Sequence, residues 1–476
     1  MLALDNLPTG QRQPSSHRQG ADERAARSGL TLLDENLDAF AARAALARTA
    51  ESTLYLQYYY WRNDLTGRLL LREIIAAADR GVRVRLLLDD FNTGGRDGGA
   101  RSLTSHTNIE VRFFNPTRSR GSAWRRRLEL LLNFVSATRR MHNKAWIADA
   151  RAAIVGGRNI GDSYFDACRE TNFSDLDILA VGPAADDAHA VFNRYWTSEA
   201  SRVRRPRAYS AARLARMRRR LERGALAPEA APYLAEAERF VAERRLEGGA
   251  GRVWTDKVRI LADPPEKAAG RKTDEWISDA IFAQIGEARA TLNIVSPYFV
   301  PGEEGVARLC GLVAAGATVK VLTNSLASTD VAAVHGGYAK YRAALIAGGV
   351  HLYELRPGAR RSRFSPFGSS QASLHTKAYT LDGRAGFVGS YNFDPRSRSI
   401  NTEMGLLFEN EELAREIDDV FVREIAPDSA YAVALEGGRL VWRAGGAEWR
   451  GLEPDATWTR RAVAWAMRWL PFEAQM

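Results

Sequence analysis

Residues 374–403 read LHTKAYTLDGRAGFVGSYNFDPRSRSINTE, and an earlier stretch, residues 141–159, reads MHNKAWIADARAAIVGGRN. Both contain the pattern H-x-K-x4-D, followed by a pair of small residues and then an asparagine. The offset between equivalent positions is constant, because 375−142, 382−149 and 392−159 all equal 233. Two unrelated loops would not keep one offset at so many positions. The sequence therefore predicts an internal duplication with one half-site in each copy.

The composition is typical of a globular protein with a basic surface. With 476 residues the chain is long enough for two to four domains. A hydrophobic content of 45% and no run of eighteen apolar residues argue against a membrane-spanning protein. The net charge of +10 indicates an anionic partner, either nucleic acid or an acidic bilayer. The two cysteines, Cys168 and Cys310, form no disulfide framework or zinc motif, and no secretory signal is visible at the N-terminus.

Helices and apolar strands alternate in the same order in both copies, which predicts an α/β fold. The matching strands are 53–61 and 291–299, 82–89 and 317–324, and 109–116 and 350–357; the matching helices are 34–50 and 273–288, and 68–79 and 305–315.

The remaining segments divide the chain into five parts. We expect a mobile tail at 1–28, a first lobe at 29–190, a basic helical connector at 191–255, a second lobe at 256–426, and a C-terminal part at 427–476. In that last part, residues 431–435 and 440–443 surround Glu436-Gly-Gly-Arg and predict a hairpin, which a basic, tryptophan-rich helix follows.

The repeated motif contains the residue types that chemistry on a phosphodiester requires. Lys144 and Lys377 can offset the phosphate charge, and the amides of Asn159 and Asn392 can donate hydrogen bonds to its oxygens. Ser390 offers a hydroxyl donor where the first copy has Gly157. Such a site supplies cations and donors from side chains, so we expect no metal and no cofactor.

The two histidines can divide the proton and nucleophile roles. A neutral imidazole can attack phosphorus to give a phosphohistidine, while a protonated imidazole gives its proton to the leaving alkoxide. Each ring also needs an orienting carboxylate. Glu403 fits this role in the second copy, and laying Asp175-Leu-Asp177 over Asn401-Thr-Glu403 assigns it to Asp177 in the first. For Asp149 and Asp382 we expect a structural role, by salt bridging or by capping backbone donors.

These motifs resemble those of the phospholipase D superfamily, and the resemblance covers residues 29–426. It is closest to the bacterial cardiolipin synthases of the C type. The similar strings are GGRNIGDSYF (156–165), FSDLDILAVGP (173–183), PYFVPGEEGV (297–306), VLTNSLASTDVAAVHGGYAKYR (321–342), ELRP (354–357) and GSYNFDPRSRSINTEMG (389–405).

The resemblance implies two αβα-sandwich lobes that meet at a pseudo-twofold axis, with one metal-free site in the cleft. It further implies that His142 is the nucleophile and His375 the general acid and base, although the near symmetry leaves that direction open. The implied reaction moves a phosphatidyl group from a donor phospholipid, phosphatidylethanolamine for this type, to phosphatidylglycerol, and cardiolipin is the product. Because both half-sites lie in one chain, a monomer could be complete.

Several segments indicate a bilayer surface. In the helix expected at 457–472, Trp458, Ala462, Trp465, Trp469 and Phe472 share one face, which is typical of a helix lying in the interface. Docking of that face on the protein's own core is the alternative. Basic and aromatic residues also precede both motifs, at 124–135 and 360–370, and could hold acyl chains and anionic headgroups or bind nucleic acid.

We therefore expect phospholipid substrates and a peripheral position on an anionic membrane, at the cytoplasmic face of a bacterial inner membrane. The alternatives are a lipid hydrolase, a metal-independent nucleic-acid phosphodiesterase, and a basic binding protein without catalysis. Intact His, Lys and Asn in both copies argue against the last.

Overall fold

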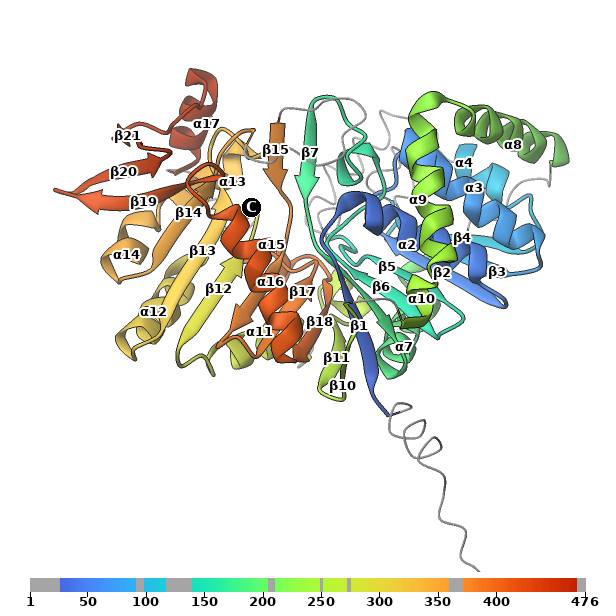
Figure 1. The fold of residues 1–476 in the computed structure, drawn as a ribbon, viewed down its shortest axis with the longest axis horizontal. Coiled ribbons are helices and arrows are strands. Elements are labelled where there is room, and N and C mark those ends of the chain that lie inside the picture. The colour runs from blue at the N-terminus through green and yellow to red at the C-terminus, as the bar shows by residue number, and fades with distance from the viewer. Residues whose placement is uncertain are drawn as a thin grey trace, which may run out of the picture.

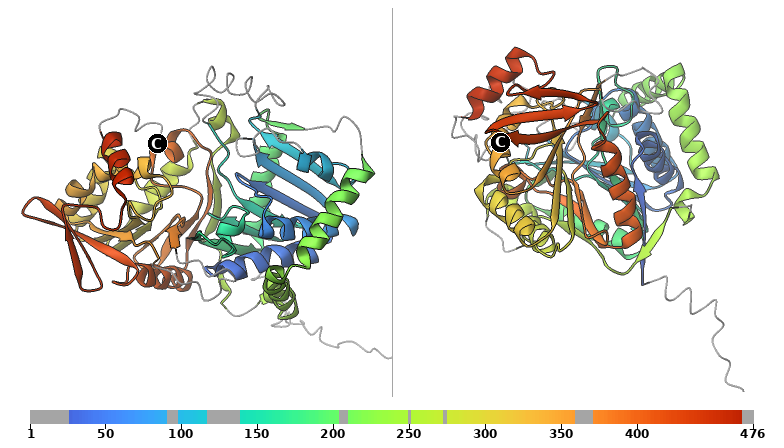
Figure 2. Two further views of the ribbon diagram at one scale, coloured as in Figure 1. Left: turned by 90° about the horizontal axis from the view of Figure 1, so that it is seen from above. Right: turned by 60° about the vertical axis from the view of Figure 1, so that its left-hand side comes forward.

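The computed structural model describes residues 26–90, 98–116, 139–203, 210–248, 251–271, 275–358 and 371–468. Two lobes lie side by side, and each is built on a mixed sheet with helices packed on it (Figures 1 and 2). This arrangement confirms the expected two-lobed α/β fold. The segments 124–135 and 360–370 lie outside the described residues, as do Trp469, Phe472 and most of the expected tail.

The sheet of the first lobe has parallel strands in its middle, where β2 pairs with β3 and β3 with β4. In spatial order its strands are β10 (Val253–Thr255), β1 (Ser28–Leu33), β8 (Asp177–Val181), β6 (Ala152–Gly156), β5 (Ala145–Ala148), β2 (Thr53–Tyr58), β3 (Arg83–Asp89), β4 (Ile109–Phe114) and β9 (Ser201–Val203).

The second sheet repeats this order, and β12, β13 and β14 are its parallel strands. Its strands are β11 (Val258–Ala262), β18 (Met404–Glu409), β17 (Ala385–Gly389), β16 (Ala378–Leu381), β12 (Thr291–Val295), β13 (Thr318–Asn324), β14 (His351–Leu355), β19 (Ala430–Glu436), β20 (Arg439–Ala444) and β21 (Ala447–Arg450). Seven neighbouring strands have the same spatial order in both sheets. They run β1-β8-β6-β5-β2-β3-β4 in the first sheet and β11-β18-β17-β16-β12-β13-β14 in the second, which confirms the duplication.

Helices cover the sheets of both lobes. Those of the first lobe and the connector are α2 (Asn36–Thr49), α3 (Leu65–Asp79), α4 (Gly98–Leu103), α7 (Pro183–Thr197), α8 (Ala211–Ala225), α9 (Ala231–Ala242) and α10 (Arg245–Gly248). Those of the second lobe are α11 (Ile277–Ile285), α12 (Gly302–Ala314), α13 (Ala332–Ala339), α14 (Arg342–Ala347), α15 (Pro395–Ser399), α16 (Glu411–Glu424) and α17 (Trp458–Arg468). Short 3₁₀ turns are η2 (Asp162–Tyr164), η3 (Pro228–Ala230) and η4 (Pro265–Ala269).

One hydrophobic cluster joins the two lobes. Phe192 and Trp196 of α7 belong to the same buried cluster as Met404 of β18 and Ile417 of α16. Burial of large apolar side chains across this boundary stabilises one relative placement of the lobes. The cleft residues described below are therefore held by a continuous core.

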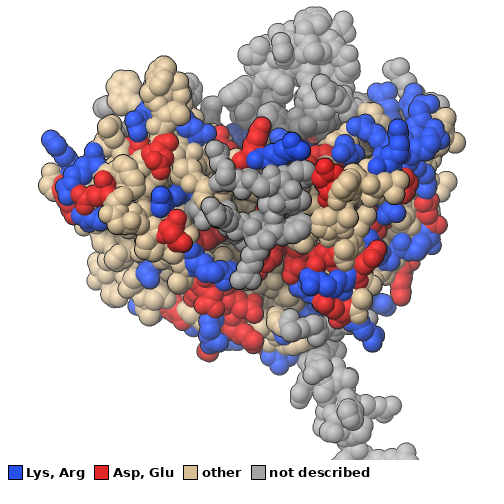
Figure 3. Space-filling model, turned by 45° about the horizontal axis from the view of Figure 1, so that its top comes forward, with Lys and Arg blue, Asp and Glu red and all other residues tan. Residues whose placement is uncertain are grey.

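The connector differs from the expected boundaries. Residues 201–203 and 253–255 were assigned to a helical connector, but they form β9 and β10 at the two edges of the first sheet. Between them, α8 carries a row of exposed arginines, and basic side chains crowd that side of the molecule (Figure 3). Helix α9 packs on α2.

The C-terminal part belongs to the second lobe. The predicted hairpin is confirmed as β19 and β20, and these strands extend the second sheet through β14. Helix α17 packs on α13 through the buried Ala464, whereas Trp458 and Trp465 are 77% and 64% exposed. Trp458 and Trp465 therefore point away from the protein's own core. The alternative expectation, in which this face docks on the core, does not fit these two residues.

Candidate active site

Each H-x-K segment lies just before the first strand of a hairpin, β5–β6 in the first lobe and β16–β17 in the second. In extended backbone, side chains two residues apart share a face, so the histidine and lysine of each motif point the same way. Lys144 and Lys377 are almost fully buried, and each donates to the backbone carbonyl of its own motif histidine. The two motifs therefore present matching histidine–lysine pairs.

The aspartate of each motif occupies the hairpin turn in the left-handed backbone region, at φ 54° for Asp149 and 51° for Asp382. Asp149 accepts hydrogen bonds from the backbone N–H groups of residues 51–53, which lead into β2. Asp382 does the same for residues 289–291, which lead into β12. These contacts are of the capping kind expected for both residues, and they explain why the spacing from lysine to aspartate is fixed.

The two motifs meet through backbone hydrogen bonds between the lobes. The His142 N–H donates to the Thr402 carbonyl at 2.8 Å, and the His375 N–H donates to the Ser174 carbonyl at 2.8 Å. Just before His375, strand β15 (Gln371–Leu374) pairs in parallel with β7 (Thr171–Ser174) of the first lobe. Each histidine is thus fixed against the opposite lobe.

As a consequence, the orienting carboxylates cross between the lobes. Glu403 Oε2 of the second lobe lies 2.8 Å from Nδ1 of His142, and Asp175 Oδ2 of the first lobe lies 2.5 Å from Nδ1 of His375. The assignment of Asp177 to this role is wrong, as is the pairing of Glu403 with its own copy's histidine. The two contacts leave Nε2 of each imidazole as the atom available for chemistry.

The error over Asp177 is a shift of two residues in the repeat alignment. Asp177 pairs with Gly156 in the first sheet, and Gly405 pairs with the equivalent Gly389 in the second, so Asp175 is the counterpart of Glu403. A shift of two along a strand keeps the side chain on the same face but moves it by about 7 Å. Sheet register, not residue spacing, contains this information.

Asp177 instead neutralises two buried arginines. Its Oδ2 lies 2.8 Å from Arg43 and 3.2 Å from Arg158, and all three side chains are essentially inaccessible to solvent. Arg158 also donates to Asn36 and to the carbonyl of Leu33. This network joins α2 and β1 to β8, the strand that begins at Asp177.

The small residues beside the carboxylates differ between the copies. A Cβ atom at Gly157 would lie 2.2 Å from Asp175 Oδ1, so the short aspartate occupies the space that a side chain would need. At the equivalent place Ser390 donates its hydroxyl to Glu403 Oε2, and Ser397 donates to Glu403 Oε1 at 2.8 Å. Each acid and its small neighbour thus form a matched pair.

Burial controls the protonation of the site. It lowers the pKa of His142 to about 4 despite the attraction of Glu403, and it lowers the pKa of His375 further below its ordinary value, an effect to which Lys377 and Lys144 add. Burial also brings the pKa of Lys377 to about 8 and that of Lys144 well below its ordinary range. Both histidines are therefore neutral at pH 7 before an anion binds.

The pKa values of the two carboxylates are shifted in opposite directions. Burial raises the pKa of Asp175. Burial also acts to raise the pKa of Glu403, but His142, Lys144 and the Ser390 hydroxyl together hold it below its ordinary value. Glu403 is consequently the more firmly ionised of the two.

The amides of Asn159 and Asn392 are buried at the site. Each has its Oδ1 atom without a hydrogen-bond partner among the described residues, and Asn159 donates from Nδ2 to the Tyr164 hydroxyl at 2.9 Å. Unpartnered buried polar atoms are costly, so a ligand or water is expected to satisfy them. Because amide oxygen and nitrogen are assigned from their surroundings, either can face a bound phosphate.

Aromatic rings hold the imidazoles, and sequence reasoning did not identify them. Tyr59 meets the ring of His142 edge-on at 5.2 Å, and Tyr164 meets that of His375 at 5.1 Å. Phe173 also lies 5.2 Å from His375. Tyr59 directly follows β2, so its position at the carboxyl end of a central strand was the available signal.

Next to His375 a polar cavity of about 300 Å³ opens between the lobes. Phe173, Arg62 and Ser163 line it from the first lobe, and Ser373 lines it from the second. Arg460 of α17 also lines it, which brings the tryptophan-bearing helix to the mouth of the cleft.

The described residues contain one other group with metal-ligand atoms close together, formed by His335, Glu354 and Glu453. Arg342 donates to both carboxylates, at 2.9 Å to Glu354 and more closely to Glu453. The guanidinium supplies the positive charge that a cation would otherwise provide. This cluster ties the C-terminal part to α14 and is separate from the histidine pair.

Comparison with known proteins gives consistent results. A family described as "Cardiolipin synthase, PLD-like domain" matches residues 44–196 and 281–425. Cardiolipin synthase C of Escherichia coli (strain K12) is 42% identical over 437 residues, which cover 87% of this chain and 88% of that protein. A cardiolipin synthase of Staphylococcus aureus (strain Mu50 / ATCC 700699) is 23% identical over 83% of this chain and 67% of its own length.

A solved structure shares the fold. The phosphatidylserine synthase of Haemophilus influenzae Rd KW20 superimposes with a TM-score of 0.57 at 14% identity, covering 87% of this chain and 91% of that one.

Proposed function

We propose that this chain, which belongs to the phospholipase D-like cardiolipin synthase family, makes cardiolipin. It does so by transferring a phosphatidyl group to phosphatidylglycerol through a phosphohistidine. The donor we propose is phosphatidylethanolamine. The observation that carries the proposal is the crossed pair of histidine–carboxylate contacts, which aims two imidazoles at one site.

In the first step Nε2 of His142 attacks the donor phosphorus, and the bond from phosphorus to the headgroup oxygen breaks. His375 gives its Nε2 proton to the departing alkoxide. Burial keeps His375 neutral in the empty site. The negative charge of an arriving phosphodiester raises the pKa of the imidazole, so the substrate itself favours the protonated acid.

In the second step neutral His375 removes the proton from a glycerol hydroxyl of phosphatidylglycerol. The resulting oxygen attacks phosphorus, the bond from phosphorus to His142 Nε2 breaks, and cardiolipin leaves. Lys144 and Lys377 offset the charge on the phosphoryl oxygens in both steps, while the side-chain amides of Asn159 and Asn392 donate to them. Protein groups thus supply both positive charge and proton transfer.

The assignment of His142 as the nucleophile rests on its carboxylate. Glu403 is ionised and held by two serine hydroxyls, so it fixes the Nδ1–H tautomer of His142 and stabilises the positive ring that forms on attack. Asp175 is the weaker anion. Its partner His375 therefore gives up a proton more readily, as an acid must.

We further propose that the protein binds peripherally to an anionic membrane, at the cytoplasmic face of a bacterial inner membrane. The exposed Trp458 and Trp465 lie on a helix that borders the cavity beside His375. This position supports peripheral binding with the cleft turned toward the membrane. Among the described residues, no helix is both long and apolar enough to cross a bilayer. Replacing both tryptophans with Ala should weaken co-sedimentation with phosphatidylglycerol vesicles, and unchanged co-sedimentation would contradict the proposal.

The function is tested by incubating the protein with phosphatidylethanolamine and phosphatidylglycerol in mixed vesicles and analysing the products by mass spectrometry. We expect cardiolipin, with an equal yield of ethanolamine, and no change with EDTA. Phosphatidic acid without cardiolipin would instead identify a hydrolase. Cleavage of DNA with no lipid turnover would overturn the lipid assignment.

A further inference from the structure

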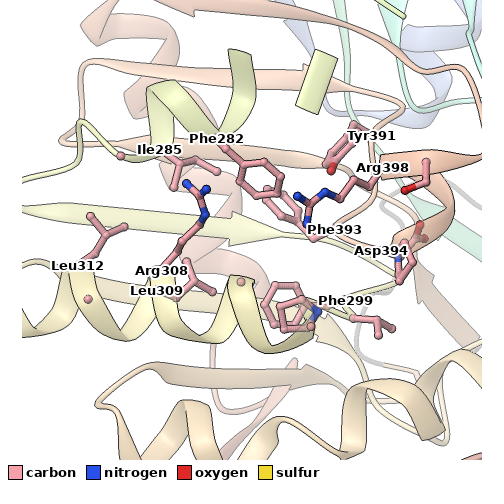
Figure 4. A pocket seen from close by; sticks show the side chains of 18 residues that line it. Phe282, Ile285, Phe299, Arg308, Leu309, Leu312, Tyr391, Phe393, Asp394 and Arg398 are labelled. Atoms are coloured by element: carbon pink, nitrogen blue, oxygen red, sulfur yellow. The ribbon is translucent and has the colours of Figure 1, made fainter. Parts of the chain in front are cut away.

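The second lobe contains an elongated apolar groove between α11 and α12, with a volume of about 610 Å³. Its walls include Phe282, Ile285, Phe299, Leu309, Leu312 and Phe393 (Figure 4). From Gly302 to Leu312 the groove follows α12 over eleven residues, or about 15 Å at the rise of an α-helix. A groove of this size and lining suits an apolar ligand.

One end of the groove reaches the segment that contributes to the active site. Tyr391 and Phe393 line it on either side of Asn392 in the sequence, and Asp394 follows them in the lining. The charge of Asp394 acts on both Glu403 and Lys377, so the groove's inner end is electrostatically coupled to the histidine–lysine site. The groove therefore ends at the short segment that also carries Asn392.

The rim of the groove is positively charged. Arg308 and Arg398 both bind Glu304, at 2.8 and 2.9 Å, which leaves one positive charge in excess. Both guanidinium groups stand over the ring of Phe282, at 5.6 and 5.9 Å from its centre (Figure 4). Their methylene stems extend the apolar wall while their charged ends face solvent, which suits the boundary between a lipid chain and its polar headgroup layer.

In the first lobe the connector covers α2, the helix that corresponds to α11. Tyr233 of α9 packs edge-on against Phe40 of α2 at 5.0 Å, and Phe240 of α9 belongs to the same buried cluster. Within the described ranges, no helix covers the groove between α11 and α12 in this way. Among the described residues, α2 is thus covered by a connector helix, whereas the groove beside α11 is not.

We propose that this groove holds one fatty acyl chain of the phospholipid whose phosphate lies between His142 and His375. This inference rests on the proposed function and adds to it the place where the chain of the substrate binds. The groove then makes recognition depend on chain length, because each methylene that it buries strengthens binding about fourfold.

A variant that fills the groove tests this directly. Gly311 lines the groove, and a Cβ atom added there meets no atom within 4 Å, so Gly311→Leu adds an apolar side chain at the groove without a clash. Ala307→Leu is the matched control, since Ala307 lies exposed on the same helix outside the lining. Both variants and the wild type are assayed in detergent micelles with donor lipids that carry six-carbon or sixteen-carbon chains.

We expect Gly311→Leu to raise KM for the sixteen-carbon donor about tenfold or more and to leave the six-carbon donor within twofold, while Ala307→Leu changes neither. Equal effects on both donors, or no effect on either, would overturn the groove assignment. If the wild type turns over no donor at all, the proposed function fails instead.

A second measurement does not depend on a variant. A phospholipid with a photoreactive group in mid-chain should cross-link the wild type to peptides of α11 or α12. Cross-links confined to other segments would contradict the proposal. This result is expected if a segment of the protein itself covers the groove.

Discussion

The two lobes place the same hairpin at the cleft but support it with different acids. In the first lobe the short Asp175 lies against Gly157, where no side chain fits. In the second, the longer Glu403 accepts hydrogen bonds from Ser390 and from a second serine. The pseudo-symmetric site is thus chemically unequal, and on this difference we base the proposal that one imidazole attacks and the other transfers the proton.

The crossing of the acids makes each half-site dependent on both lobes. His142 is oriented by Glu403 of the second lobe, and His375 by Asp175 of the first. Neither lobe could orient its own histidine alone. The hydrophobic cluster shared by the lobes consequently supports the geometry of both histidine–carboxylate contacts.

The largest expected effect comes from removing the histidines one at a time. His142→Ala should lose all measurable transfer, and His375→Ala should lose about 10² to 10⁴-fold with natural donors. A donor with a p-nitrophenyl headgroup separates the roles, because p-nitrophenolate leaves without a proton. We expect His375→Ala to release one burst equivalent of p-nitrophenol from this donor, and His142→Ala to release none.

Stopped-flow absorbance measures the burst, and mass spectrometry of rapidly quenched protein locates the phosphoryl adduct. A burst in His142→Ala with none in His375→Ala would reverse the assignment of the two lobes.

A smaller effect should distinguish Asp175 from Asp177, which lie two residues apart where the chain enters β8. Asp175→Asn should lower kcat by about 10² to 10⁴-fold with little change in stability, because the His375 ring loses its charged partner. Asp177→Asn should instead cost about 3–5 kcal/mol of stability, because Arg43 and Arg158 lose their buried counter-charge. Denaturant unfolding and kcat per active site, measured on both variants, check the contrast.

Glu403→Gln is the matched variant for the second lobe, with a loss in kcat expected to resemble that of Asp175→Asn. The opposite result would be a large loss of kcat in a folded Asp177→Asn variant while Asp175→Asn stays active. That result would restore the sequence alignment of Asp177 with Glu403.

These two aspartates also show how far sequence reasoning reaches. The duplication, the order of helices and strands, and the histidines, lysines and asparagines at the site follow from a repeated local pattern with a constant offset. The acids do not, because they lie after an insertion, and there only strand pairing defines equivalence. Crossing between lobes, the rings around the imidazoles, and the groove depend on tertiary contacts that no local pattern contains.

The smallest effect concerns protonation of the two histidines. Burial lowers the pKa of His142 to about 4, whereas the unfolded chain keeps a value near 6.5. Between these values the unfolded state binds more protons, so this part of the stability is complete above pH 6.5 and is lost as pH falls toward 4. Relative to His142→Gln, which does not titrate, the wild type should lose about 3 kcal/mol of unfolding free energy across that range.

The same titration compares the lobes directly by NMR of protein labelled at the histidine rings. His142 should titrate above His375, because only His142 faces a firmly ionised acid. Inorganic phosphate bound between the rings should raise both values, since an anion stabilises the imidazolium form. If His375 titrated above His142 in the empty site, Asp175 would be the stronger anion, and the unequal acids could no longer explain which imidazole attacks.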